Sequence, residues 1–191
     1  IPNLFQLFSD AGYRTTGRSQ RHDVFRFLDY EPFVGPADPD AKDQILGSLE
    51  KTFAALVQPQ GKQFSFLHLW YAHGGYGLGG IADAPNLRRM VQEGQIAQAL
   101  RYYYAAVVHL QEFVLAELLK RVDLDEWAVF VFGDHGEGFC DEVMAHGDGL
   151  HQNVTRVPLL AHVPGRELHF PQPASMIDLF PTIANLAGIE A

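Results

Sequence analysis

The sequence changes abruptly from apolar to polar within one stretch, Val129-Phe130-Val131-Phe132-Gly133-Asp134-His135-Gly136-Glu137. The apolar run over residues 127–132 has no alternation of polar and apolar positions, which is typical of a strand buried on both faces of a parallel sheet. We therefore predict a central strand here, with helices covering both faces of the sheet. Gly133 ends the strand, and the polar loop begins immediately after it.

Strand and helix patterns alternate on both sides of this stretch. Helical spacing of apolar residues predicts helices over residues 1–11, 40–57 and 95–122, and an S-x-x-D capping pattern starts another at Ser175. Short apolar runs predict strands over residues 13–16, 63–70 and 157–163. This order predicts the α/β class, as a three-layer α/β/α sandwich with a mostly parallel sheet.

Composition limits the kinds of partner. The 191 residues include 14 basic and 23 acidic side chains, with a net charge of −9, and 47% are hydrophobic, which is enough for a core. A negative net charge argues against a nucleic-acid partner, because phosphates need a positive footprint. An acidic protein that acts on an anionic substrate needs local positive charge, and a divalent cation is the simplest source. The single cysteine, Cys140, excludes an intramolecular disulfide, and the compartment and any membrane association stay open.

Asp134 and His135 directly follow the predicted strand, where open α/β sheets form their ligand sites. A carboxylate beside an imidazole, followed by a glycine that lets the backbone turn, suits oxygen-plus-nitrogen coordination of a divalent cation. The same residues are equally compatible with a loop that carries a surface aspartate and a capping histidine. Spacing alone does not separate these two interpretations.

Further motifs accompany this stretch along the chain. They are Ala11-Gly12-Tyr13-Arg14-Thr15, His68-Leu69-Trp70-Tyr71-Ala72-His73-Gly74-Gly75-Tyr76, His146-Gly147-Asp148-Gly149-Leu150, Thr155-Arg156-Val157-Pro158-Leu159-Leu160 and Ile177-Asp178-Leu179-Phe180-Pro181-Thr182. Together with residues 129–139, these six segments resemble, in order, the sulfatase branch of the alkaline phosphatase superfamily. The resemblance implies an alkaline-phosphatase-like fold and a metal-dependent hydrolase that acts on a small anionic ester, a sulfate ester.

The resemblance also implies residue roles. Asp134 and His135 match two metal ligands, and His73 matches a histidine that meets the substrate's anionic group, although the aspartate and proline around that histidine are replaced here. His146 matches a basic residue that faces the ester oxygens, and we predict that it is the leaving-group acid; the alternative is a ring that merely caps the loop. Glu137 either orients His135 or is solvated. The implied cofactor is a divalent metal ion, Ca²⁺ first, with Mn²⁺ or Zn²⁺ as alternatives.

One motif of the family is not found. The sequence contains no Cys/Ser-x-Pro-x-Arg nucleophile motif and nothing similar to the first strand, whose aspartates complete the metal shell. We therefore predict that residues 1–191 are a partial sulfatase-type catalytic domain, N-terminally incomplete, which alone binds metal weakly and has no appreciable turnover. Two other functions stay open: a phosphoester hydrolase or phosphoryl headgroup transferase of the same superfamily, and a non-catalytic module that retains the fold.

Overall fold

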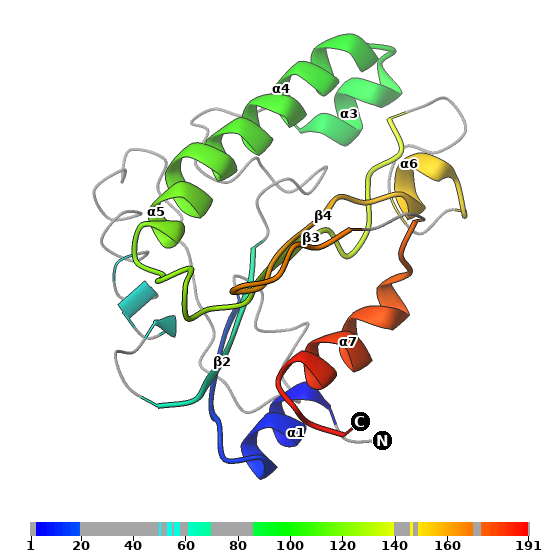
Figure 1. Ribbon diagram of the computed structural model, residues 1–191. Coiled ribbons are helices and arrows are strands. Elements are labelled where there is room, and N and C mark those ends of the chain that lie inside the picture. Colours follow the sequence, from blue (N-terminus) through cyan, green and yellow to red (C-terminus); the bar gives the residue numbers. More distant parts are fainter. Residues whose placement is uncertain are drawn as a thin grey trace. The chain divides into compact units, whose positions relative to one another are not determined.

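The chain forms two compact units. The computed structural model describes residues 3–19, 50, 53–54, 56–57, 61–69, 86–139, 146, 149–169 and 173–190. One unit comprises Ile1–Gly35, Gly47–Leu69 and His169–Ala191, and the other comprises Pro36–Leu46 and Trp70–Leu168. Figure 1 shows their helices and strands coloured along the sequence.

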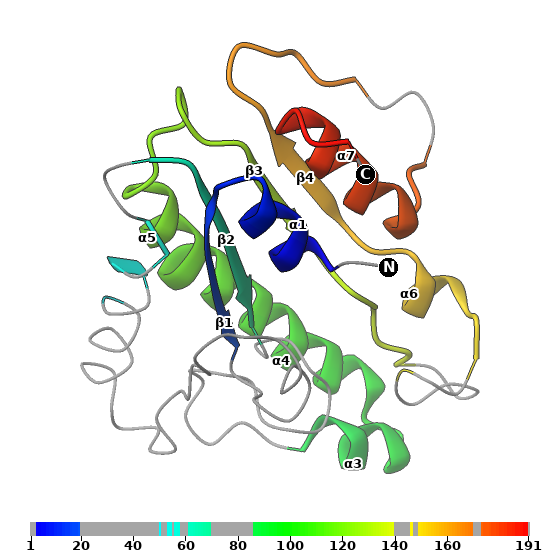
Figure 2. The ribbon, with the colours of Figure 1, turned by 90° about the horizontal axis from the view of Figure 1, so that it is seen from below.

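A parallel strand pair is the centre of the first unit. β1 (Arg14–Ser19) and β2 (Gln63–His68) run side by side, with their first residues opposite each other (Figure 2). Helix α1 (Leu4–Asp10) packs against these strands, and the Phe8 ring stacks on the Phe64 ring with the centroids 4.4 Å apart. The helix predicted over residues 1–11 and the strands predicted over residues 13–16 and 63–70 are therefore confirmed.

The last helix of this unit begins with the predicted capping box. The 3₁₀ turn η2 (Met176–Asp178) leads into α7 (Leu179–Leu186). The Ser175 side chain accepts a hydrogen bond from the Asp178 backbone N–H, and Asp178 Oδ2 accepts one from the Ser175 N–H at 3.2 Å. Gly188 follows the helix with φ +72°, a left-handed conformation that glycine adopts without strain.

Removal of this cap gives a simple test of the local structure. Ser175→Ala should lower the free energy of unfolding by about 1 kcal/mol, because an N–H group at the start of the helix loses its acceptor. Urea denaturation followed by circular dichroism measures the change. Ser9→Ala, at an exposed serine in α1, is the matched control. Equal midpoints for the two variants would mean that the cap does not contribute to stability.

The second unit combines a helical layer with an antiparallel strand pair. Helix α4 (Ile96–His109) continues through the π-helical stretch η1 (Leu110–Leu115) into α5 (Ala116–Leu119), and Figure 1 shows one continuous rod. β3 (Val129–Phe132) pairs with β4 (Leu159–His162) (Figure 2). The helix predicted over residues 95–122 and the strand predicted over residues 157–163 are confirmed.

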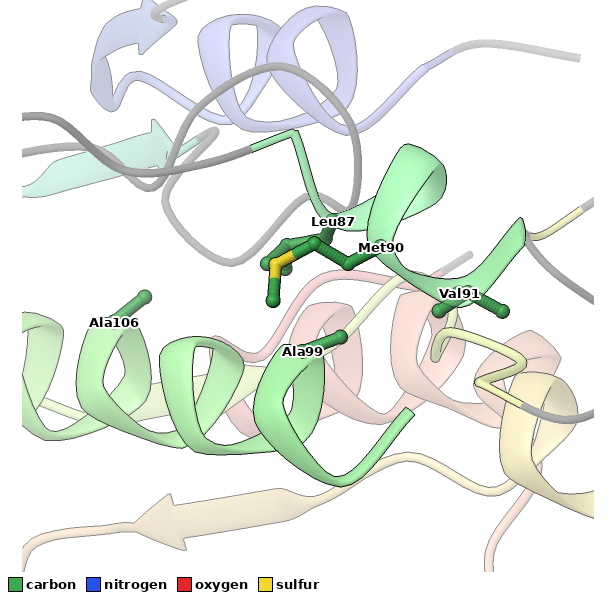
Figure 3. Packing of buried hydrophobic residues seen from close by; sticks show 5 residues of the cluster. All are labelled: Leu87, Met90, Val91, Ala99 and Ala106. Atoms are coloured by element: carbon green, nitrogen blue, oxygen red, sulfur yellow. The ribbon is translucent and has the colours of Figure 1, made fainter. Parts of the chain in front are cut away.

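The core of the second unit lies between α4 and the short helix α3 (Leu87–Gln92). Figure 3 shows the side chains of Leu87 and Met90 directed toward α4, where Ala99 and Ala106 are fully buried. Alanines at these positions let the two helices approach closely. No helix in these described stretches is long and apolar enough to cross a bilayer.

The parallel pairing predicted for the strand over residues 127–132 is wrong for the neighbour that the structure describes, whereas its central position and the helices on both faces of the sheet stay predictions. In the described part of its unit β3 pairs with one strand, β4, and the two run antiparallel, with Val129 opposite His162. An apolar run indicates burial but not the direction of the neighbouring strand, which depends on the connection. Here the described part of the connection contains only a four-residue helix, α6 (Gln152–Thr155), not a long crossover helix.

Helices mixed with strands and a small parallel sheet agree with the predicted α/β class. The three-layer sandwich and the incomplete N-terminus stay predictions. In the helix predicted over residues 40–57, Phe53 and Leu56 are helical and buried, and residues 40–49 lie outside the described residues.

Candidate functional site

Backbone hydrogen bonds hold the loop that follows β3. The Gly133 N–H donates to the Pro158 carbonyl at 3.3 Å, and the Gly136 N–H donates to the Val154 carbonyl at 2.7 Å. The Asn153 side-chain amide donates to the Gly138 carbonyl at 2.7 Å. Residues 133–138 are therefore shaped by α6 and the segment after it, and this fixes where the polar side chains of the loop are directed.

Asp134 and His135 bring a carboxylate and an imidazole close together. Asp134 Oδ2 lies 3.8 Å from His135 Nε2, and the His135 N–H donates to Asp134 Oδ1 at 3.0 Å. Two ligand atoms that each lie about 2.1 Å from one ion are at most about 4.2 Å apart. The two side chains can therefore reach a common ion. The Asp134 side chain is 66% exposed, so an ion can approach from solvent.

The hydrogen bond of the His135 ring determines which nitrogen can bind metal. His135 Nδ1 lies 2.9 Å from the Gly136 carbonyl oxygen. A carbonyl oxygen only accepts, so Nδ1 carries the proton, and in the neutral ring Nε2 has the lone pair that a metal ion requires. Histidines that bind metal commonly donate their other N–H to a carbonyl in this way. The donor chemistry therefore fits a divalent cation.

Glu137 is buried, with only 4% of its side chain exposed. Its Oε1 lies 2.9 Å from His146 Nδ1, which joins two residues nine positions apart. The His146 ring in turn stacks on the His135 ring, with centroids 3.9 Å apart and planes 28° apart. One potential ligand atom each from His135, Glu137 and His146 lie within 4.8 Å of one another. Two histidines and one buried carboxylate thus form a compact cluster beside Asp134.

Phe139 anchors the end of this loop on α4. It adopts φ +54°, a conformation that is unusual for a residue other than glycine, and its ring lies edge-on to Tyr103 at 5.0 Å. Burial raises the pKa of the Tyr103 phenol above its usual value, and the negative charge of Glu137 raises it further. The phenol therefore stays neutral at physiological pH. The charge of the buried Glu137 carboxylate thus affects Tyr103 as well as His146.

The structure brings together three of the four residues singled out from the sequence: Asp134, His135 and His146. His73 lies outside the described residues. The interpretation of Glu137 as a solvated residue is wrong, because the residue is only 7% exposed. A glutamate between two glycines gives no sign in the sequence of its burial or of a partner at His146.

Comparisons with known proteins show the family to which the chain is similar. Residues 1–189 match the family model described as Sulfatase. The chain is 30% identical over 104 residues to Arylsulfatase K of Mus musculus and 33% identical over 105 residues to Choline-sulfatase of Rhizobium meliloti (strain 1021). These alignments cover 51% and 52% of this chain but only 18% and 20% of the two relatives. The matched region is thus a minor part of each relative's length.

Two solved structures share the fold. The C-terminal periplasmic domain of EcEptC from Escherichia coli matches with a TM-score of 0.64 at 19% identity, over 99% of this chain and 62% of that one. The lipoteichoic acid synthase LtaP from Listeria monocytogenes matches with a TM-score of 0.56 at 17% identity, over 100% and 53%. At these identities the likeness is one of fold alone.

Proposed function

The chain belongs to the sulfatase family, and from this membership we propose that it is part of an enzyme that hydrolyses sulfate esters with a divalent metal ion held by Asp134 and His135. The observation that carries the proposal is the 3.8 Å separation of Asp134 Oδ2 and His135 Nε2, with His135 Nδ1 bonded to a backbone carbonyl. The relatives named as sulfatases support a sulfate ester as the substrate class.

Each residue has a distinct task in this proposal. A bound divalent ion would neutralise the anionic oxygens of the ester. Asp134 supplies a charged oxygen ligand, and His135 supplies a nitrogen ligand whose ring orientation is set by the Gly136 carbonyl. His146 gives a proton to the leaving oxygen, and His73 binds the anionic group of the substrate.

The identity of the bound metal ion can be tested by comparing Ca²⁺, Mn²⁺ and Zn²⁺. The sequence-based expectation is Ca²⁺, which takes six to eight oxygen ligands. One of the two proposed ligands is the imidazole nitrogen of His135, whereas Ca²⁺ takes oxygen ligands. We propose Mn²⁺ or Zn²⁺ on this ground. Titration calorimetry with the three ions decides between them, and tighter binding of Ca²⁺ would restore the first expectation.

Substrate class is tested on the full-length protein with 4-nitrophenyl sulfate and 4-nitrophenyl phosphate, with and without a chelator. Faster turnover of the sulfate that is lost with the chelator and returns with added metal supports the proposal. The opposite preference supports a phosphoester hydrolase or transferase. Metal binding without turnover of either ester supports a non-catalytic module.

The acid role of His146 predicts a dependence on the leaving group. In the full-length protein, His146→Ala should slow esters with poor alkyl leaving groups by about 10²-fold or more, because such oxygens need a proton as the bond breaks. Activated aryl esters should change far less. Steady-state kinetics on both ester types measures the difference. Equal losses on both would leave His146 as an anion-binding or structural residue.

His162→Ala is the control for this experiment. His162 is an exposed histidine on β4, and its Nε2 donates to the Leu124 carbonyl. Its replacement should leave both ester types unchanged.

A further inference from the structure

We propose that Glu137 is a positioning residue, whose buried carboxylate holds His146 in the tautomer with the proton on Nδ1 and directs Nε2 toward the reacting ester. The catalytic consequence rests on the proposed function, since it assumes that His146 is the leaving-group acid. The tautomer itself is a property of the chain without metal or substrate.

The hydrogen bond determines the direction of donation. Glu137 Oε1 lies 2.9 Å from His146 Nδ1, the usual length of a charge-assisted bond. An ionised carboxylate only accepts, so Nδ1 must donate. Burial makes the bond matter more, because a buried carboxylate without hydrogen bonds is costly and the surroundings screen the interaction weakly.

The ring of His146 is restrained in two ways. Stacking on His135 sets the plane of the ring. A half-turn about χ2 within that plane would exchange Nδ1 for Cδ2 and lose the bond to Glu137, so the bond selects one of the two orientations. A histidine without such a partner prefers the proton on Nε2. Glu137 reverses that preference, so that Nε2 of the neutral ring is free to take a proton from solvent. The resulting imidazolium keeps its Nδ1 proton on Glu137 and gives the Nε2 proton to the leaving oxygen.

The same cluster has a second interpretation, in which Glu137 and His146 bind an ion directly. Two ligands of one tetrahedral zinc ion, each at about 2.1 Å, lie about 3.4 Å apart, which is longer than the observed 2.9 Å between Oε1 and Nδ1. Adjacent ligands of an octahedral ion at the same bond length lie about 3.0 Å apart, close to the observed distance. The distance therefore argues against tetrahedral coordination, and the metal titration separates positioning from octahedral coordination.

The experiment is nitrogen NMR of the histidine rings in the full chain, for the unchanged protein, Glu137→Met and Glu137→Gln. Methionine keeps the side-chain volume but offers no carboxylate, and glutamine keeps an oxygen acceptor. We expect Nδ1 of His146 to be protonated in the unchanged chain. We expect the proton to move to Nε2 in Glu137→Met and to return to Nδ1, at least in part, in Glu137→Gln.

Two internal references show that the fold is intact. His162 Nε2 donates to a carbonyl 2.7 Å away, so its resonances should be the same in all variants. Glu126→Gln, at an exposed glutamate of the same unit, should leave the His146 resonances unchanged. If His146 keeps its proton on Nδ1 in Glu137→Met while the His162 resonances are unchanged, Glu137 does not select the tautomer and the proposal is overturned.

Metal titration separates positioning from coordination. With Mn²⁺ or Zn²⁺ alone as the probe, Glu137→Met should bind like Glu126→Gln. A loss of affinity of about tenfold or more would make Glu137 a ligand or the partner of one, and would overturn the proposal. In the full-length protein, Glu137→Met should share the leaving-group dependence of His146→Ala. If the tautomer changes in Glu137→Met but the unchanged full-length protein does not turn over sulfate esters, the proposed function is contradicted and the positioning role of Glu137 is not.

Discussion

Replacing Asp134 with alanine should abolish the binding of divalent metal ions to this chain and should slow ester turnover by the full-length protein by more than about 10²-fold. Loss of a residue that merely supports a metal ligand costs about 10- to 100-fold, so loss of the charged ligand itself costs more. Asp134 is also largely exposed, and its replacement leaves no buried cavity. The effect should therefore fall on metal binding and not on stability.

Titration calorimetry with Mn²⁺ and Zn²⁺ measures this loss directly. Asp125→Ala is the matched control, because Asp125 is an exposed aspartate of the same unit. The affinity of the Asp125→Ala variant for both ions should equal that of the unchanged chain. If Asp134→Ala binds as tightly as the control, Asp134 is not a ligand, and an ion would have to be held by His135, Glu137 and His146.

Gly136→Ala should have the largest effect on stability, a loss of about 3 kcal/mol or more, at the upper end of what added atoms cost in tightly packed regions. A Cβ atom at this position would lie 1.9 Å from the Asn153 carbonyl oxygen. The carbonyl oxygen belongs to the backbone, and the backbone also fixes the position of a Cβ atom, so no change of rotamer relieves the clash. α6 would have to move away, and the 2.7 Å bond from the Gly136 N–H to Val154 would break.

Urea denaturation and metal titration together test this prediction. Gly133→Ala is the matched control, because its Cβ would meet the side chain of Val157 at 3.3 Å, a contact that a small adjustment relieves. We expect a small change for Gly133→Ala, whereas Gly136→Ala should lose both stability and metal affinity as the loop moves. Similar unfolding midpoints for the two variants would mean that α6 yields easily and that Gly136 is not required.

Much of the local structure could be predicted from residues close together in the sequence. The helix over residues 95–122 follows from apolar spacing, and the start of the last helix follows from Ser175 and Asp178, whose side chains satisfy each other's backbone N–H groups. The strand followed by Asp134 and His135 was equally local, because a short apolar run and two adjacent polar residues need no distant partner to be recognised. The family was recognisable from the order of six short motifs.

Only the tertiary structure decided what depends on residues far apart in the chain. The apolar run of β3 is compatible with a parallel or an antiparallel neighbour, and the return of residues 159–162 along its edge made the pair antiparallel. Gly136 is required because the backbone of α6 lies against it. The sequence around Glu137 is compatible with an exposed or a buried side chain, and only the folded chain places Nδ1 of His146 against its carboxylate. The spacing of apolar residues and helix capping involve only a few neighbouring residues, so they can be recognised in the sequence. Burial and hydrogen bonds between distant residues arise only when the chain is folded.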